Sequence, residues 1–199
     1  MTLLELIARA DERGLATSGV ACLDRLLPPP EGGGDQEPLR PLWPACESGT
    51  QWAARIDAVH TALEAVAKSD ATAARVRTLL GAAPRHFDAG PLRAWADACS
   101  LLALDVHREF DVPAGSGAEA PGCGRDGGAV DAGPLAAGEL RRQVRILEDL
   151  AGTTGTTGTT GTAGGGAGLR GILDLSAEGR RVLRAVMSRR ARGRGLPLK

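Results

Sequence analysis

The sequence predicts an all-α protein, a small alanine-rich helical bundle of four to six helices. Strand signals are scarce, because the chain has ten valines, four isoleucines and no tyrosine and no stretch alternates apolar and polar residues over a useful length. Apolar residues recur instead every three or four positions, which is the spacing of a helix with one buried face. Glycine-rich segments between the helices are expected to be flexible loops.

The chain is expected to begin with a hairpin of two helices. Thr2 and Glu5 fit a capping box for a helix over residues 3–13, in which hydroxyl and carboxylate satisfy free backbone N–H groups. Gly14 suits the left-handed residue that ends such a helix. The second helix is expected over about residues 18–27, before three consecutive prolines.

A helix-turn-helix, which is a DNA-binding motif, is the alternative for this hairpin. Its spacing is matched by Ala10, Gly14, Val20 and Leu23. Arg13, however, stands where the motif requires an apolar residue. An ordinary helical hairpin is therefore favoured.

Residues 28–47 are expected to form a loop. Pro38, Pro41 and Pro44 are three residues apart, which is the period of a polyproline II helix and suggests a docking strip for a partner. A stiff connector anchored on its own domain by Trp43 is favoured over docking.

Three further helices are expected before residue 112. The third covers about residues 48–67, the fourth begins after the cap Asp70, and the fifth runs from Pro91 to Val112-Pro113. Together with the hairpin they make a helical bundle over residues 1–111. The apolar faces expected to point inward are Trp52, Ile56, Val59, Leu63 and Val66, then Val76, Leu79 and Leu80, and finally Leu92, Trp95, Cys99, Leu102, Val106 and Phe110.

The rest of the chain divides by composition. Residues 112–134 are expected to be a flexible loop, and residues 135–151 an additional bundle helix with Leu140, Val144 and Leu147 on one face. Residues 152–168 read GTTGTTGTTGTAGGGAG, a composition that cannot bury a core and indicates a low-complexity linker. Residues 169–199 are expected to form a tethered basic amphipathic helix and tail.

Charge is distributed unevenly between these parts. Residues 1–151 contain 15 Lys+Arg and 22 Asp+Glu, a net charge of −7, whereas residues 169–199 contain 9 and 2, a net charge of +7. The tail helix is expected to begin at the cap Ser176 and to end near Ala191, with its apolar side formed by Val182, Leu183, Val186 and Met187. The candidate contacts to nucleic acid or another anion are Arg180, Arg181, Arg184, Arg189, Arg190, Arg192 and Arg194.

These arginines allow several interpretations. Guanidinium groups pair with phosphates of nucleic acid or of an anionic membrane surface, and they also pair with the acids of a protein. Docking of the helix on its own acidic body, or a solvated face, is favoured over nucleic acid, membrane surface or a protein partner.

A metal site is a weak alternative. His60 has Asp57 three residues before it, and His107 lies near the end of the fifth expected helix. A di-iron bundle would require two Glu-x-x-His motifs, and the chain has none. Half-buried or surface histidines are favoured, so no metal, catalytic residue or cofactor is expected.

The remaining motifs and the cysteines indicate no further site. Residues 122–127 match G-x-G-x-x-G but follow no strand, so the match is attributed to chance. Cys22, Cys46, Cys99 and Cys123 form no C-x-x-C pair, and neither a signal peptide nor an apolar run long enough for a membrane span is visible. A cytoplasmic protein of bacterial composition is expected.

The function expected from the sequence is that of a non-enzymatic protein-interaction or regulatory module. It would act through helix faces and a basic C-terminal arm, with a protein partner or self-association. The alternative is a nucleic-acid-binding regulator that grips phosphate through the arginine-rich helix. An enzyme or metal-binding bundle that uses His60 and His107 is the third interpretation.

Overall fold

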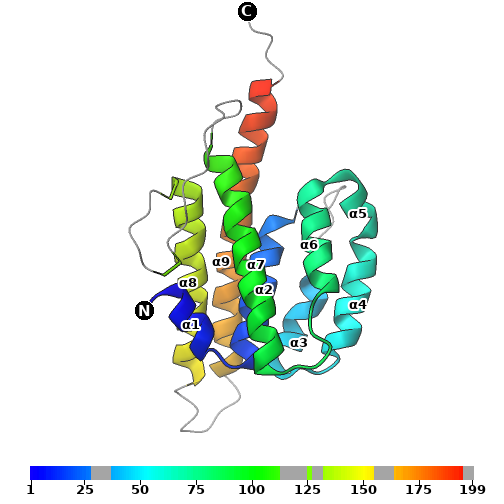
Figure 1. Cartoon of the computed structure of the whole chain (residues 1–199), viewed down its shortest axis with the longest axis vertical. Helices are drawn as coiled ribbons and strands as arrows, with labels where there is room; N and C mark the ends of the chain where they lie inside the picture. The colour runs from blue at the N-terminus through cyan, green and yellow to red at the C-terminus, as the bar shows by residue number, and fades with distance from the viewer. Residues whose placement is uncertain (28–36, 113–124, 127–131, 155–163, 195–199) are drawn as a thin grey trace, which may run out of the picture.

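The computed structural model describes residues 1–27, 37–112, 125–126, 132–154 and 164–194 (Figure 1). Within these residues every regular element is a helix, which confirms the all-α prediction. The described part has more helices than the four to six expected. The elements are α1 (Leu3–Arg9), α2 (Glu12–Leu26), η1 (Arg40–Leu42), α3 (Trp43–Ser48), α4 (Trp52–Ala62), α5 (Glu64–Ser69), α6 (Ala71–Gly81), α7 (Ala89–Asp111), α8 (Pro134–Thr154) and α9 (Gly164–Arg194).

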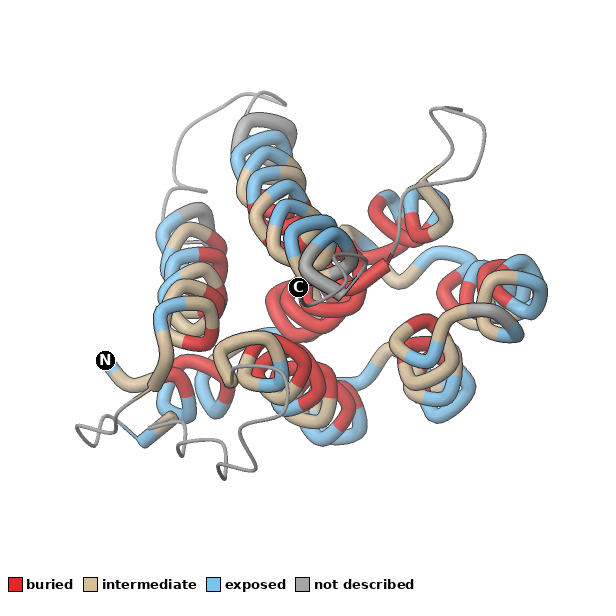
Figure 2. Tube along the Cα trace, turned by 90° about the horizontal axis from the view of Figure 1, so that it is seen from above, coloured by how far each residue is buried: buried red, intermediate tan, exposed pale blue. Residues whose placement is uncertain are grey.

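Helix α2 is the centre of the molecule. Every residue from Gly14 to Leu26 is buried, because α2 packs against α3, α6, α7, α8 and α9. In the view along the bundle, the central helix is buried on all its sides (Figure 2). Its alanine and glycine residues let the surrounding helices approach closely.

The boundary between α1 and α2 differs from the prediction. The capping box of Thr2 and Glu5 is confirmed, but the first helix ends at Arg9, and Gly14 does not end it. The Asp11 carboxylate accepts a hydrogen bond of 2.7 Å from the Gly14 N–H and so begins α2. An N-cap aspartate two residues after α1 starts the next helix earlier than the expected Ser18.

Part of the loop expected over residues 28–47 is helical in its described portion. Pro41 lies inside η1 and Pro44 inside α3, so these prolines do not continue a polyproline II strip. Proline is well suited to the first turn of a helix, where its missing N–H costs nothing. Trp43 is buried, as an anchoring residue would be.

The third expected helix is two helices, α4 and α5, that meet at Leu63. Its inward face is nevertheless largely as expected, with Trp52, Ile56 and Val59 buried. The Asp70 cap is confirmed, because its carboxylate accepts a hydrogen bond of 2.6 Å from the Ala73 N–H.

An aromatic junction joins this part of the chain to α7. The Trp52 ring meets the edges of Phe87 and Trp95 at centroid distances of 5.5 and 5.6 Å. Both tryptophan N–H groups donate at 2.8 Å to backbone carbonyls, from Trp52 to Pro84 and from Trp95 to Leu79. A β-carbon on Gly19 of α2 would lie 2.5 Å from the Trp95 ring, so this glycine allows α7 to reach α2.

Helices α7 and α8 follow the expected helices closely. Asp111, the last residue of α7, caps α8 by accepting hydrogen bonds of 2.9 Å from the N–H groups of Leu135 and Ala136. The carboxylate of one helix end therefore supplies the acceptors that the next helix start lacks.

Helix α9 begins much earlier than the expected cap Ser176, which is buried inside it. Of the expected linker 152–168, residues 152–154 belong to α8 and residues 164–168 to α9, while residues 155–163 lie outside the described part. Ile172 and Leu183 of α9 are buried in the common core. The basic segment is therefore packed into the bundle, and its C-terminal end extends beyond α7 (Figure 1).

Candidate functional site

Helix α9 is held on the body by two arginines from the expected set. Arg180 pairs with Asp24 of α2, with 3.2 Å between Nη1 and Oδ1, and it also contacts the Glu37 carboxylate. Asp24 is only 1% exposed and Arg180 8%. Arg180 is thus a docking residue and has no free face for nucleic acid.

Arg190 holds the other end of α9 against the end of α7. Its Nη1 donates to the Glu109 carbonyl at 3.0 Å, and its Nη2 donates to the Phe110 carbonyl at 3.0 Å and to the Val112 carbonyl. The guanidinium lies 5.0 Å from the centre of the Phe110 ring. These carbonyls carry the partial negative charge of a helix C-terminus, which a cation stabilises.

The other arginines of the expected set differ in their surroundings. Arg181, Arg189 and Arg192 are exposed, and they have no hydrogen-bond or ion-pair partner among the described residues. Arg184 is half-buried, and the side chain of Arg194 lies outside the described part. The structure therefore brings together only some of the seven arginines on one outward face.

The outward face of α9 is divided by charge. Exposed Asp174 and Glu178 precede Arg181 at helical spacing. Exposed Ala185 and Ser188 follow, and Arg189 and Arg192 end the same side of the helix. The first half of this outward stripe carries both acids together with the exposed Arg170, and the second half carries only bases, a separation that the net charge of the segment conceals.

A buried polar network lies on the inner side of the bundle. Arg25 of α2 and Glu139 of α8 form an ion pair with both side chains 0% exposed, with 2.9 Å between Nε and Oε2 and 2.5 Å between Nη2 and Oε1. Gln143 donates to Glu139 at 2.9 Å and accepts from the Ser100 hydroxyl at 2.6 Å. His107 contributes an imidazole whose Nε2 is 3.7 Å from Glu139 Oε2.

The ionisation states of Glu139 and His107 depend on their burial and on the groups buried beside them. Burial alone would raise the pKa of Glu139, but the charge of Arg25 and the hydrogen bonds from Arg25 and Gln143 hold it below its ordinary value. Burial lowers the pKa of His107, whose Nδ1–H donates to the Ala103 carbonyl at 2.7 Å. The result is an ionised carboxylate beside a neutral imidazole.

Glu139, Gln143 and His107 of this network are buried and offer no group to a substrate at the surface. Burial raises the pKa of Cys22 to about 12 and raises that of Cys99 well above its ordinary value, so neither thiol is an activated nucleophile. The arrangement can orient α2, α7 and α8 relative to one another, and it offers no reacting group at a surface. The sequence analysis missed it, although Glu139 stands next to the apolar face of its expected helix.

The histidines are not brought together. His60 lies on α4, where a β-carbon on Gly81 of α6 would lie 3.2 Å from its Nε2, whereas His107 of α7 faces Glu139 of α8. Helices α4 and α8 lie on opposite sides of the molecule (Figure 1). Asp57 pairs with Arg85 at 2.6 Å. The described ranges contain no group of three potential metal ligands, so the His60–His107 site is not supported.

The helix-turn-helix alternative is wrong for this fold. A recognition helix must present side chains to the major groove, but α2 is buried along Gly14–Leu26. Arg25, the base that such a helix would offer, is committed to Glu139, and Arg13 pairs with Glu47 at 2.9 Å.

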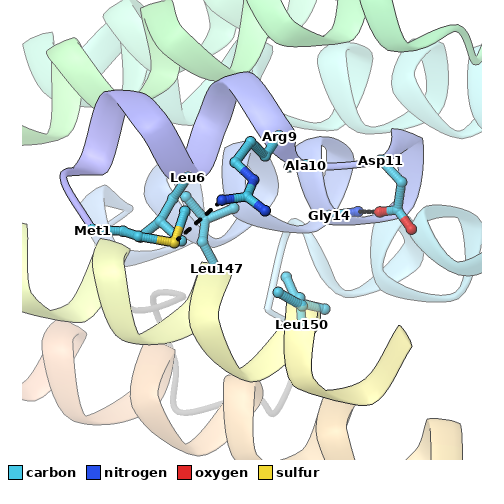
Figure 3. A pocket seen from close by; sticks show the side chains of 9 residues that line it. Met1, Leu6, Arg9, Ala10, Asp11, Gly14, Leu147 and Leu150 are labelled. Atoms are coloured by element: carbon cyan, nitrogen blue, oxygen red, sulfur yellow. Dashed lines mark hydrogen bonds between the residues drawn. The ribbon is translucent and has the colours of Figure 1, made fainter. Parts of the chain in front are cut away.

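Among the described residues, cavities border α1 and α8 and also lie between α2 and α9. One of about 300 Å³ lies between α1 and α8, with Leu6, Leu147 and Leu150 as its apolar wall (Figure 3). Its polar groups have partners, because Asp11 caps α2 and Arg9 donates to Met1 Sδ at 3.9 Å. Another, of about 190 Å³, lies between α2 and α9.

Some expected features cannot be compared with the structure. The G-x-G-x-x-G match and Cys123 lie mainly or wholly outside the described residues. Among the helices in the described ranges, none is long and apolar enough to cross a membrane. Comparison with protein-family models, curated proteins and solved structures found no match.

Proposed function

We propose that the protein is a non-enzymatic interaction module whose outward α9 stripe binds a protein surface of complementary charge. The observation that supports this proposal is the division of the stripe, with Asp174 and Glu178 in one half and Arg181, Arg189 and Arg192 in the other. The inner side of α9 is already used for docking, so the stripe is the part of this helix available to a partner.

The division favours protein over nucleic acid. Phosphates repel the carboxylates of Asp174 and Glu178, whereas a protein surface can place a base opposite each acid and an acid opposite each base. Such matching determines the orientation of the partner as well as its affinity.

A second copy of the chain provides a complementary face. If two α9 helices lie antiparallel, Asp174 faces Arg192, Glu178 faces Arg189 and Arg181 faces Ala185. The same contacts occur twice about a two-fold axis. Exposed ion pairs are worth about 0–1 kcal/mol each, so we expect weak, salt-sensitive dimerisation.

Charge-swap variants test this proposal by sedimentation velocity at low and high salt. Asp174→Arg/Glu178→Arg and Arg189→Glu/Arg192→Glu are each expected to abolish association, and the variant with all four changes is expected to restore it. Glu64→Arg/Glu148→Arg, with two exposed acids on other helices, is the matched control. A monomeric wild type at low salt, or a four-fold variant that stays monomeric, would contradict dimerisation.

Nucleic-acid binding is the second candidate, since Arg181, Arg189 and Arg192 have unused donors. Labelled mixed-sequence duplex DNA across a salt series tests it with the variant Arg181→Met/Arg189→Met/Arg192→Met. Truncation before α9 is unsuitable because it removes the buried Ile172 and Leu183 and uncovers the surfaces of α2 and α8 on which α9 packs. Binding that falls steeply with salt and is lost in the triple variant would favour the regulator. Absence of binding at low salt would remove this candidate.

A further inference from the structure

The cavity between α2 and α9 carries an inference independent of the proposed function. It has a volume of about 190 Å³ and is lined by Arg25 at the end of α2 and by Arg180 and Arg184 of α9. Three guanidinium groups from two helices therefore meet at one cavity.

Two of these guanidinium groups have buried donors without a partner in the described residues. Arg25 gives Nε and Nη2 to Glu139, but its Nη1 is unpaired, and the side chain is 0% exposed. Arg184 is half-buried, and its Nε is buried and also unpaired. An unsatisfied buried donor is costly, so a ligand that accepts from these groups stabilises the folded protein.

One of the three guanidinium groups that line the cavity has no ion pair among the described residues. Arg25 and Arg142 both form ion pairs with Glu139, and Arg180 forms ion pairs with Asp24 and Glu37. Arg184 has no ion pair of its own; burial and the neighbouring Arg180 lower its pKa, and the charges of Asp24 and Glu37 oppose that shift.

The rest of the lining is apolar. Leu26 and Leu183 are buried, and Met187 is partly buried against the core. A small volume with a cationic side and an apolar side suits a short organic anion better than a bare inorganic ion or a large ligand.

We propose that this cavity is a binding site for a short-chain carboxylate, whose carboxylate group pairs with Arg184 and whose apolar chain lies against Leu26, Leu183 and Met187. Because the ligand touches both α2 and α9, binding stabilises the docked position of α9 by mass action. The carbonyls at the end of α2 oppose an anion, so we expect a Kd of roughly 0.1–10 mM.

Isothermal titration of the full chain with hexanoate tests the proposal, with hexanamide as the uncharged probe and inorganic phosphate as the probe without an apolar chain. Hexanoate is expected to bind and to raise the melting temperature, and each of the other two is expected to bind at least about tenfold more weakly.

Variants locate the site. Arg184→Met keeps the apolar stem, and it is expected to weaken hexanoate binding by about tenfold or more. Arg55→Met, with the same loss of charge at an exposed position of α4, is the matched control and is expected to stay within about twofold. Ser188→Trp places a bulky side chain at the exposed edge of the cavity and is expected to block binding without disturbing the core.

Several results would overturn the proposal. Hexanoate that gives no binding at about 10 mM would indicate that only water occupies the cavity. Equal binding of hexanamide would remove the role of charge, and equal binding of phosphate would remove the role of the apolar chain. Unchanged affinity in Arg184→Met would place the ligand elsewhere.

Discussion

The Arg25–Glu139 pair couples the centre of the bundle to α8 through two fully buried charges. We expect Arg25→Met to lower the free energy of unfolding by about 3–5 kcal/mol, because it leaves the Glu139 carboxylate buried without its cation. Replacing both residues by methionine removes both charges and is expected to recover at least half of that loss. Chemical denaturation measures the free energy of unfolding of the single and the double variant. A double variant as unstable as Arg25→Met would show that the unpaired Glu139 charge is not the cause of the loss.

Asp24 gives the fold a specific pH dependence. Burial raises its pKa from 3.8 to about 6, although Arg180 opposes the shift. A carboxyl with a raised folded-state pKa contributes stability that is complete below pH 3.8 and is lost as the pH rises through about 6. Between these values the wild type should lose stability relative to Asp24→Asn.

Denaturation curves of the two proteins from pH 4 to pH 7 measure this difference. At pH 7 the Asp24→Asn variant is expected to be more stable by about 1–3 kcal/mol, since asparagine resembles the neutral acid. Parallel pH profiles for wild type and variant would show that Asp24 is not the group responsible.

The packing around Gly19 leaves no space for a methyl group. A β-carbon there lies 2.5 Å from the Trp95 ring, whose position is fixed by Trp52 and by its hydrogen bond to Leu79. Gly19→Ala is expected to cost about 1–3 kcal/mol through overpacking. Gly138→Ala in α8 meets only the far end of Arg142 at 3.5 Å, and it should be neutral or stabilising. Equal effects at both sites would contradict the packing argument.

At the scale of elements, Arg190 connects the ends of α7 and α9. Arg190→Met removes its donors to two α7 carbonyls and to the carbonyl of Val112, which follows α7, and its contact with the Phe110 ring. A loss of about 1–2 kcal/mol is expected, with faster amide exchange at the end of α7. Arg189→Met, at the exposed neighbouring position, should change neither quantity. If both variants behave alike, the contact does not stabilise the helix end.

Helix faces could be predicted from the sequence better than helix ends. Leu92, Trp95 and Cys99 are buried as their spacing indicated, because the period of an α-helix directly determines which residues share a face. Ends depend on which of several capping groups is used. The second helix begins after the cap Asp11, so Gly14, which was expected to end the first helix, lies inside the second. Ser176 does not cap α9, because that helix begins well before it.

At the scale of the whole molecule, the candidate site could be predicted only in part. The basic character of the last helix was visible in the sequence, but its division into docked and outward arginines depends on where α9 packs. The Arg25–Glu139 pair joins residues 114 positions apart, and no local pattern signals such a contact. The cavity at Arg184 likewise exists only once α9 lies on α2.

The complete burial of α2 has a consequence for synthesis on the ribosome. Its residues leave the ribosome early, whereas Ile172, Leu183 and Arg180, which cover it from α9, are made more than 140 residues later. At roughly 5–20 residues per second the nascent α2 waits on the order of 7–30 s for this cover. During that interval its apolar surface is a target for chaperones, and the core is completed only once α9 has been synthesised.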